Sequence, residues 1–393
     1  MASKNLKKVL WFILMAVGIM ALPACGGGGS SEAIKIGAIH DLTGATSDVG
    51  TPYADGIRDY VKFVNGNDGI NGRQIELLSA DYAYAVDQAE QLYSQYTGQG
   101  VVAFQGWGTG DTEALRTKIA TDEIPFMSAS YSAALASPDE APYNFLIGTT
   151  YSDQFIIALQ YAKENGATSV AIFHHDSPFG LSPVDDGKAW AEANGMSVIS
   201  IPMPGGATDF TAQLTQAQDA GAEYIVIQNV SSPASTLVKD VARLGMDDVQ
   251  VVCLNWCSDE LFVSLAGDAA EGVIAASPFA FPSSGADLIE NEIRTWTEAN
   301  GVNLDEKGVH YVQGWTTMRA MVDGIRQVVA NGDEVTGPNI KAALEGYTNY
   351  STGGVTTPIT FTGSDHAGSK ALQLYQVQGG AWEKISDYIS AGN

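Results

Sequence analysis

The chain has few basic residues and few cysteines. Its 393 residues include 20 Lys and Arg against 45 Asp and Glu, which gives a formal net charge of −25. A chain this acidic repels phosphate backbones, so we expect no nucleic-acid partner. The three cysteines, Cys25, Cys253 and Cys257, are too few for a disulfide scaffold and lack the spacing of a zinc site. The fold must therefore depend on packing among the 45% of residues that are hydrophobic.

Motifs for catalysis and for metal or cofactor binding are also missing. The sequence contains no G-x-S-x-G, no P-loop, no H-E-x-x-H and no EF-hand loop. His174, His175 and Asp176 are adjacent, but neighbouring side chains on an extended segment point to opposite faces, and no further ligand is placed near them. We therefore expect no enzyme activity, no metal and no cofactor.

The N-terminal segment has the pattern of an export signal. Three lysines precede an apolar run over residues 9–22, which is too short to span a bilayer, and the sequence LPAC ends at Cys25. This order resembles a bacterial lipoprotein signal, which implies cleavage after residues 1–24 and lipidation of Cys25. An ordinary cleaved secretory signal is the alternative, and both interpretations place the protein outside the cytoplasm. Residues 25–32 would then be a Gly- and Ser-rich flexible tether between the membrane and the folded part.

From Ile34 onward, short apolar runs rich in β-branched residues alternate with segments of helical spacing. This alternation is typical of βαβ units and a parallel sheet. We predict strands over residues 34–39, 74–80, 101–105, 125–128, 169–173, 196–201, 224–229, 250–254, 272–276, 357–361 and 371–377, and helices over residues 112–123, 151–165, 183–194, 211–219, 232–244, 288–300 and 311–331. The chain should therefore be an α/β protein with two doubly wound parallel-sheet lobes.

Two lobes of this kind predict a ligand cleft between them, beyond the carboxyl ends of the strands. Gly106 to Gly110 (GWGTG) follows a predicted strand and begins a helix, so its backbone N–H groups and the Thr109 hydroxyl could hold a carboxylate. A tight turn without a ligand is the alternative, and the spacing is not that of a dinucleotide site. Ser128 to Ser132 (SASYS) follows the next strand in the same way and offers small hydroxyls beside Tyr131.

Two cysteines close together in the sequence leave one question open. Cys253 and Cys257 lie on either side of Leu254-Asn255-Trp256, at the end of a predicted strand. In an oxidising compartment they could form a disulfide, which would require a loop that folds back on itself. The alternative is a pair of small buried thiols.

Four sequence blocks resemble the leucine/isoleucine/valine-binding proteins, which are type I periplasmic solute-binding proteins of ABC importers. The blocks are IKIG with DLTG (residues 34–44), GINGRQIEL (69–77), PGGATDF (204–210) and LAGDAAEG (265–272). They occur in the order in which the family has them and are spread over most of the chain after the signal.

The resemblance implies a two-lobed clamp with three crossings between the lobes, which closes on its ligand and then docks on a permease. Lobe 1 would comprise residues 33–147 with 279–365, and lobe 2 residues 148–278 with 366–393. The partners implied are a small amino acid or carboxylate, the permease and ATPase subunits of the importer, and the membrane through the lipid anchor. A ligand-sensing receptor component with the same clamp is the alternative to an importer component.

The resemblance also implies which residues bind the ligand. They are Trp107, Gly108, Thr109, Ser130, Tyr131, Ser132, Phe179, Ser231, Asn255 and Trp256. Asn255 stands where the family has an acidic residue that pairs with the ligand's ammonium group. The ligand is therefore expected to be either a branched-chain type amino acid, with Asp41 or Asp176 supplying the charge, or a related small hydrophobic or aromatic carboxylate. A small amide is a further alternative, and the aromatic residues among the ten could instead serve lobe packing.

Overall fold

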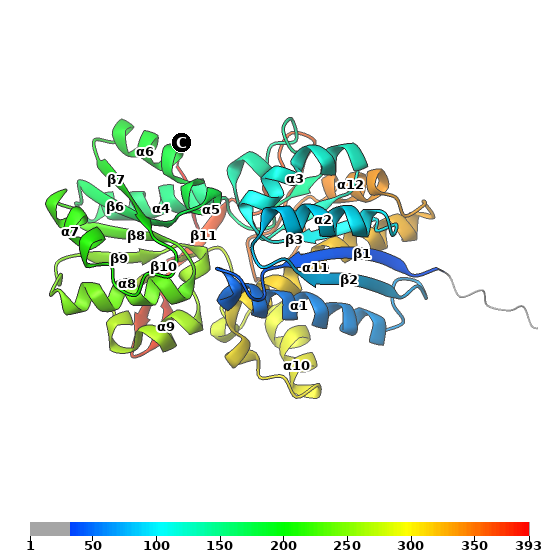
Figure 1. Cartoon of the computed structure of the whole chain (residues 1–393). Coiled ribbons are helices and arrows are strands. Elements are labelled where there is room, and N and C mark those ends of the chain that lie inside the picture. The colour runs from blue at the N-terminus through cyan, green and yellow to red at the C-terminus, as the bar shows by residue number, and fades with distance from the viewer. Residues whose placement is uncertain (1–31, 393) are drawn as a thin grey trace, which may run out of the picture. The chain divides into compact units, whose positions relative to one another are not determined.

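The computed structural model describes residues 32–392 of the chain. The predicted signal segment, residues 1–24, and the predicted lipidation site, Cys25, lie outside the described residues. Within the described part, the α/β fold predicted from the sequence is confirmed, because two sheets of mostly parallel strands alternate with helices along the chain (Figure 1).

The first sheet has five strands in the order β2-β1-β3-β4-β5, and all neighbours are parallel. Its strands are β1 (Ile34–His40), β2 (Ile75–Asp81), β3 (Ala103–Gly106), β4 (Phe126–Ser128) and β5 (Asn144–Phe145). The helices that connect these strands or pack beside them are α1 (Ser47–Gly66), α2 (Val86–Thr97), α3 (Thr109–Asp122), α10 (Thr295–Ala299), α11 (Leu304–Asn331) and α12 (Gly337–Glu345). We call this sheet with these helices the first lobe.

The second sheet has eight strands, in the order β12-β11-β10-β9-β8-β6-β7, with β13 paired to β11. Its strands are β6 (Ser169–His175), β7 (Ser197–Met203), β8 (Tyr224–Gln228), β9 (Gln250–Cys253), β10 (Ile274–Ser277), β11 (Ala371–Gln378), β12 (Ala381–Lys384) and β13 (Ile389–Ser390). Its helices are α4 (Tyr151–Glu164), α5 (Pro178–Leu181), α6 (Val184–Ala193), α7 (Thr211–Asp219), α8 (Ser231–Arg243) and α9 (Glu260–Ala266). We call this sheet with these helices the second lobe.

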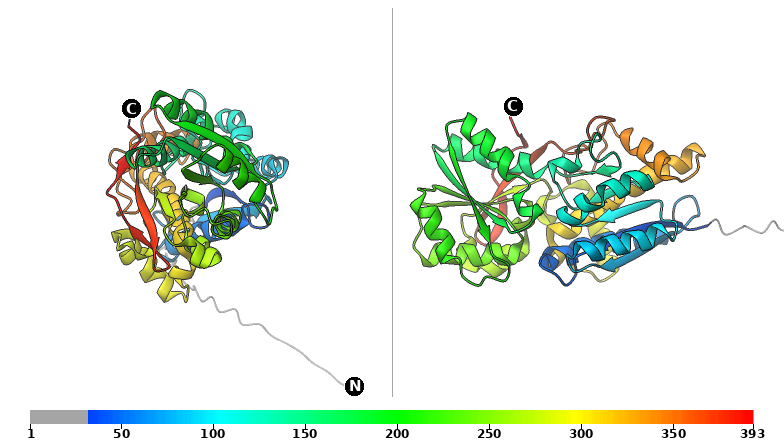
Figure 2. Two further views of the ribbon diagram at one scale, coloured as in Figure 1. Left: turned by 90° about the vertical axis from the view of Figure 1, so that its left-hand side faces the viewer. Right: turned by 45° about the horizontal axis from the view of Figure 1, so that its top comes forward.

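Helices cover the sheets, and the central strands are accordingly apolar. All five residues of β8, Tyr224–Gln228, are buried, and four of them are Tyr, Ile or Val. A strand covered on both faces has a continuous run of apolar residues, whereas a strand with one face exposed to solvent alternates apolar and polar residues. Figure 2 shows the two sheets as separate bodies of strands, with the red C-terminal strands joined to the green sheet.

The C-terminal part of the chain enters the second sheet at β11, and just before that strand it runs beside the segment that leads from β5 to α4. Leu146 and Ala367 form a parallel bridge, and the Thr149 hydroxyl donates to the carbonyl oxygen of Ala371, 2.8 Å away. Two of the passages of the chain between the sheets are therefore hydrogen-bonded to each other. The exact residue boundaries predicted for the two lobes remain a proposal.

Helices α1 and α11 touch backbone to backbone in the first lobe. A β-carbon on Gly56 would collide with the carbonyl oxygen of Tyr311, and one on Gly314 would collide with the carbonyl oxygen of Tyr53. Both glycines therefore lie where any side chain would force the two helices apart.

Three predicted elements differ from the structure. Residues 357–361 form no strand, because Ile359 makes only an isolated bridge with Tyr350. The helix predicted over residues 288–300 is a π-helical segment, Ile289–Arg294, followed by α10. Helix α11 begins at Leu304, before the predicted start, and contains a non-helical residue, Gly308, with φ of 71°.

Candidate functional site

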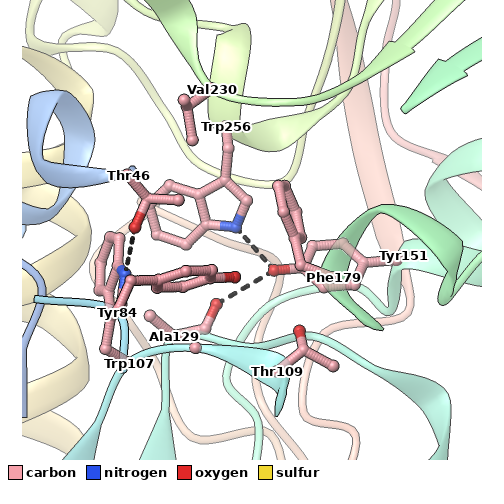
Figure 3. Close-up of a pocket in the computed structure, with 10 residues that line it drawn as sticks. Thr46, Tyr84, Trp107, Thr109, Ala129, Tyr151, Phe179, Val230 and Trp256 are labelled. Carbon is pink, nitrogen blue, oxygen red and sulfur yellow. Dashed lines mark hydrogen bonds between the residues drawn. The ribbon is translucent and has the colours of Figure 1, made fainter. Parts of the chain in front are cut away.

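A small cavity lies where the carboxyl ends of strands from both sheets meet (Figure 3). Its empty volume, including the part open to solvent, is about 240 Å³. The lining residues are Thr46, Tyr84, Trp107, Gly108, Thr109, Ala129, Tyr151, Phe179, Val230 and Trp256. The first lobe supplies the residues that follow β1 to β4, and the second lobe supplies those that follow β6, β8 and β9, together with Tyr151 at the start of α4.

The N-terminus of α3 forms one side of the cavity. The helix begins at Thr109, and the preceding Gly108 is extended and offers no side-chain cap. A β-carbon on Gly108 would collide with the carboxylate of Asp111, so only glycine fits at this point. The hydroxyl groups of Thr109 and Ser130 are hydrogen-bonded at 2.7 Å. A helix N-terminus with a hydroxyl beside it is a suitable site for an anion.

Aromatic rings form the other walls, and the indole N–H groups of the two tryptophans donate hydrogen bonds to neighbouring lining residues. Trp107 Nε1 donates to Thr46 Oγ1 at 2.8 Å, and Trp256 Nε1 donates to the Tyr151 hydroxyl at 2.7 Å. The rings of Trp107 and Trp256, one from each lobe, meet edge to face with centroids 4.9 Å apart. Because these N–H groups already have partners, the walls present mainly ring surface to a ligand.

Tyr84 reaches the cavity from an unusual turn after β2. Ala83 and Tyr84 both have positive φ angles, 51° and 59°, which residues other than glycine rarely adopt. Asp81 stabilises this turn, because its Oδ1 accepts hydrogen bonds from the backbone N–H groups of Leu42 and Ala83, both at 2.9 Å. Left-handed residues of this kind cluster at binding sites, where the surrounding structure holds them.

Among the residues that the structure describes, no charged side chain lines the cavity. Asp41, one of the two acids predicted to replace the missing charge, accepts hydrogen bonds from the N–H and hydroxyl of Thr46, both at 2.8 Å. The other, Asp176, is exposed and is not among the lining residues. Asp111 lies behind Gly108, and burial raises the pKa of its carboxyl group to about 7.

The structure divides the ten ligand-binding residues predicted from the sequence. Five of them line the cavity, namely Trp107, Gly108, Thr109, Phe179 and Trp256. The other five are buried next to it without lining it, namely Ser130, Tyr131, Ser132, Ser231 and Asn255. Whether these ten residues bind a ligand stays a prediction.

Hydrogen bonds show what the five residues that do not line the cavity do instead. Ser130 bonds to Thr109, and the Ser132 hydroxyl donates to Glu113 Oε1 at 3.0 Å. The Tyr131 hydroxyl accepts a hydrogen bond from Gln313 Nε2, on α11, at 2.6 Å. The partners of Ser231, Asp259 Oδ2 and the Trp256 carbonyl oxygen, lie at 2.6 Å and 3.3 Å.

Asn255 lies below the aromatic wall. Its backbone N–H donates to Gln154 Oε1 at 3.1 Å, and its side-chain nitrogen Nδ2 is buried without a hydrogen-bond partner among residues 32–392. The position that carries an acid in the resembling family is thus neutral here and is not part of the cavity lining.

Cys253 and Cys257 are free and buried in the structure. Cys253 ends β9, and Cys257 belongs to a short 3₁₀ turn, Asn255–Cys257. The Cys257 sulfur lies 3.5 Å from the carbonyl oxygen of Ile227 and 3.6 Å from that of Leu254. The pairing considered from the sequence is therefore not formed, and the alternative of two small buried thiols describes the structure.

The described part of the chain has neither a metal-binding cluster nor a membrane-spanning helix. Between residues 32 and 392, no group of three His, Cys, Asp or Glu side chains is arranged to hold a metal ion. His174 Nε2 instead lies 2.9 Å from the Ser200 hydroxyl, and His175 Nδ1 lies 2.8 Å from the Ser177 hydroxyl. In the same part of the chain, no helix has the length and apolar character needed to cross a membrane.

Sequence reasoning missed half of the lining residues. These are Thr46, Tyr84, Ala129, Tyr151 and Val230. Ala129 and Val230 follow strands that were predicted, so the rule that ligands bind at strand ends could have included them. Tyr151 begins α4 directly after the chain passes between the sheets, a place that a sequence pattern does not reveal.

The fold and the cavity define a class of protein. Two α/β lobes joined by several passages of one chain, with a cavity at the facing strand ends, form the type I periplasmic binding fold. The chain belongs to the family described as "Periplasmic binding protein", whose model matches residues 33–381. The family resemblance seen in the sequence is thereby confirmed.

Proteins of known structure or curated sequence resemble this chain over most of its length. A branched chain amino acid ABC transporter protein from Thermus thermophilus with bound valine has a TM-score of 0.87, 27% identity, and coverage of 92% of this chain and 97% of that one. An ABC transporter substrate binding protein from Aeropyrum pernix has a TM-score of 0.84 and 29% identity, with the same coverage. The leucine-, isoleucine-, valine-, threonine-, and alanine-binding protein of Pseudomonas aeruginosa is 21% identical over 303 residues, which are 76% of this chain and 79% of the relative.

Proposed function

We propose that the chain is the solute-binding component of an ABC importer that works outside the cytoplasm, and that it binds a small carboxylate with a compact hydrophobic or aromatic body. The observation that carries this proposal is the composition of the cavity: a helix N-terminus and a hydroxyl on one side, aromatic rings on the others, and no charged side chain in the lining. The names of the relatives support the transport role, because they describe ABC transporter proteins and amino-acid binders.

The carboxylate would lie at the start of α3. Backbone N–H groups at a helix N-terminus carry a partial positive charge, and the hydroxyl of Thr109 adds a neutral hydrogen bond. The apolar part of the ligand would contact the rings of Trp107, Phe179 and Trp256, which are each 4% exposed in the structure. Closure of the lobes over the ligand excludes water and so strengthens these hydrogen bonds.

The neutral lining bears on the choice between amino acids and simple carboxylates. An ammonium group in this cavity would lack an ionic partner, and a hydrogen bond to a charged group contributes roughly 1.5–3 kcal/mol. A ligand without an α-amino group avoids this loss. We therefore expect deaminated analogues of branched-chain amino acids to bind at least as tightly as the amino acids themselves.

A lipid anchor at Cys25 is a second part of the proposal. The lysines, the apolar run and the LPAC sequence support it. The experiment is to express the full chain and a Cys25→Ala variant and to compare their distribution between membrane and soluble fractions. We expect the variant to move to the soluble exported fraction. Equal retention of both on the membrane would contradict the anchor.

A melting-temperature screen tests the binding function. The panel contains leucine, isoleucine and valine, their deaminated carboxylates, phenylacetate, and the corresponding amides. A ligand that binds only the folded state stabilises it by about 2.7 kcal/mol at a hundred times its Kd. We expect the carboxylates to raise the melting temperature. If amino acids alone raised it, the proposed ligand class would be wrong, and if no member did, the binding proposal would lose its support.

A further inference from the structure

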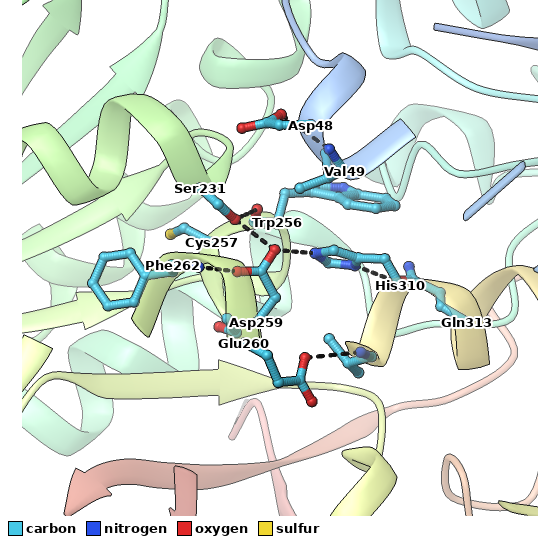
Figure 4. Close-up of polar contacts among 12 residues, drawn as sticks. Asp48, Val49, Ser231, Trp256, Cys257, Asp259, Glu260, Phe262, His310 and Gln313 are labelled. Carbon is cyan, nitrogen blue, oxygen red and sulfur yellow. Dashed lines mark hydrogen bonds and ion pairs between the residues drawn. The ribbon is translucent and has the colours of Figure 1, made fainter. Parts of the chain in front are cut away.

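A cluster of acidic and polar side chains from both lobes lies near Trp256 (Figure 4). Its members are Asp48, Ser231, Asp259, Glu260 and His310, and we call it the closure cluster. None of these residues lines the ligand cavity. The cluster therefore has a role that the proposed binding chemistry does not explain.

His310 is attached to the first lobe. It lies on α11, directly after the break at Gly308. The residues on either side tie this part of α11 to α1, because the Tyr311 hydroxyl donates to Asp59 at 3.0 Å and Lys307 pairs with Asp55 at 2.7 Å. His310 must therefore move with the first sheet when the lobes separate.

Asp259 is attached to the second lobe. Its Oδ1 caps α9 by accepting the N–H of Phe262 at 2.6 Å. Its carbonyl oxygen accepts from Trp382 Nε1, on β12, at 2.9 Å. Asp259 must therefore move with the second sheet.

Three carboxylates bridge the lobes. His310 Nε2 lies 3.1 Å from Asp259 Oδ2, and the side chains of both residues are at most 4% exposed. Glu260 accepts the backbone N–H of Val309 at 2.9 Å. Asp48, on α1, accepts the backbone N–H of Ser232, at the start of α8, at 2.9 Å. Each contact pairs an atom of one lobe with an atom of the other, so each is lost when the cleft opens.

One hydrogen bond and one neighbouring carboxylate favour the doubly protonated form of the His310 ring. Gln313 Nε2 donates to the Tyr131 hydroxyl at 2.6 Å, which leaves Gln313 Oε1 as the acceptor 3.0 Å from His310 Nδ1. Gln313 Oε1 therefore accepts a hydrogen bond from Nδ1, whereas the Asp259 carboxylate lies 3.1 Å from Nε2 as a charge partner without forming a hydrogen bond within residues 32–392. A carboxylate at this distance stabilises the imidazolium cation.

The closure cluster contacts the cavity wall through Trp256. The rings of His310 and Trp256 have centroids 4.9 Å apart at an angle of 30°. The Ser231 hydroxyl links Asp259 to the same residue, because it lies 2.6 Å from Asp259 Oδ2 and 3.3 Å from the Trp256 carbonyl oxygen. Trp256 is thus held between the closure cluster and the cavity.

We propose that Asp259 and His310 are positioning residues for ligand binding, which form an ion pair only when the lobes are closed and thereby hold Trp256 against the ligand. The proposal rests on the proposed binding function. Neither residue touches the ligand, and their effect is on the population of the closed state. A ligand that binds only the closed state has an apparent affinity in proportion to that population.

Proton uptake gives the proposal a distinctive signature. Burial lowers the pKa of His310, but the pairing with Asp259 and the neighbouring Gln313 and Glu260 outweigh burial, so the pKa is raised. Burial raises the pKa of Glu260 to about 7, and burial also raises the pKa of Asp48. In an open cleft these groups regain water and their ordinary pKa values.

The sign of the pH effect follows from these shifts. Groups whose pKa is raised in the closed state stabilise it below their ordinary pKa, and this contribution is lost as the pH rises through the raised value. The closed state should therefore become less stable as the pH rises from about 5 to above about 7. Glu260 and Asp48 lose their protons first, and His310 loses its proton afterwards. The other charged groups that line the adjoining groove are Asp55, Asp305, Glu306 and Lys307.

The first experiment measures closure without ligand. Spin labels are placed on Thr117→Cys and Lys188→Cys, two exposed positions on α3 of the first lobe and α6 of the second lobe, and the distance distribution is recorded across the pH range. We expect the closed population to fall as the pH rises. We expect Asp259→Asn, which keeps an oxygen to cap α9, and His310→Gln to reduce it at low pH and to flatten the profile.

A variant that is expected to increase the closed population distinguishes a specific effect on closure from misfolding, which would only decrease it. Glu260→Gln keeps an acceptor for the Val309 N–H but cannot become charged, so we expect more of the closed state than in the parent protein above about pH 7. His366→Gln is the matched control, because His366 Nε2 also lies 3.1 Å from an acid, Glu345, and its Nδ1 lies 2.7 Å from the Asn144 carbonyl oxygen. Both partners belong to the first lobe, although the boundary predicted from the sequence placed residue 366 in the second. We expect it to change the melting temperature and to leave the closed population unchanged.

Binding to leucine and to its deaminated carboxylate is then measured across the same pH range. We expect Asp259→Asn and His310→Gln to raise Kd about tenfold or more at about pH 5, and His366→Gln to leave it unchanged. A closed population and a Kd that do not depend on pH, or that the two variants leave unchanged, would overturn the proposal while the binding function stands. If neither probe binds, the binding function fails for these ligands, and the label distances still decide whether the ion pair controls closure.

Discussion

The hydroxyl groups of Thr109 and Ser130 are hydrogen-bonded to each other at 2.7 Å, across two neighbouring loops of the first sheet. Thr109 begins α3, and Ser130 follows β4. Either hydroxyl can be the donor of this bond. When Ser130 donates to Thr109, the Thr109 proton is free for a ligand carboxylate, so the pair can turn toward a ligand without losing its own bond.

Replacing Thr109 by valine should weaken ligand binding. Valine has nearly the same shape as threonine but no hydroxyl group. Ser130 and the ligand carboxylate would therefore each lose their hydrogen bond to residue 109. We expect Kd to rise about tenfold, the equivalent of about 1.4 kcal/mol. The measurement is isothermal titration calorimetry with the best ligand of the thermal screen. Thr117→Val, at an exposed position of the same helix, is the control, and an equal effect of both variants would contradict a specific role for Thr109.

Replacing Trp256 by phenylalanine should weaken binding by a different route. Phenylalanine cannot donate to the Tyr151 hydroxyl, and its smaller ring leaves space in the wall of the cavity. We expect a higher Kd for the carboxylates and a lower melting temperature without ligand. Trp190→Phe, on α6 and outside the cavity lining, controls for the loss of one indole ring. Unchanged affinity in Trp256→Phe would show that this wall does not contact the ligand.

Replacing Gly56 by alanine should destabilise the protein. In most helices this change is stabilising by about 1 kcal/mol, because alanine is the better helix former. Here the added methyl group would meet the backbone of Tyr311, and overpacking of this kind typically costs about 1–3 kcal/mol. Urea denaturation measures the difference. Gly205→Ala, where the new carbon meets open space, should change the unfolding free energy by less than about 0.5 kcal/mol. A stabilised Gly56→Ala variant would refute the close contact.

His40 should make the protein less stable in mild acid. Its ring is fully buried at the end of β1, and burial together with nearby Arg58, opposed by Asp81, lowers its pKa to about 3. The unfolded chain binds a proton near pH 6.5, so the unfolding free energy should fall as the pH drops from about 6.5 toward 3. The difference between the parent protein and His40→Leu in urea denaturation at several pH values isolates this contribution. A difference that does not vary with pH would contradict it.

Much of the fold could be predicted because most strands and helices carry their own periodic pattern. The predicted helix Thr211–Asp219 agrees with the structure to the residue, and the first strand begins at Ile34 as predicted. The segment 357–361 has the composition of a strand, but it makes only an isolated bridge with Tyr350, and pairing with a neighbouring strand is what makes a strand. Long-range pairing of this kind is not visible in a local pattern.

The candidate site could be predicted only where it follows directly from the end of a strand. Trp107 and Thr109 were found because their loop joins β3 to α3. Tyr84 was missed because its place depends on two left-handed residues held by Asp81. His310 was missed as a partner of Asp259 because the pair exists only after α11 has packed on α1 and the lobes have met.

The backbone contact between α1 and α11 limits how this protein can vary. With no side chain at Gly56 or Gly314, the backbones of the two helices pack in direct contact. His310 lies on α11, one position before Tyr311. A larger residue at either glycine would push α1 and α11 apart and so displace the imidazole relative to Asp259. Two positions outside the cavity lining would thus affect the proposed ion pair.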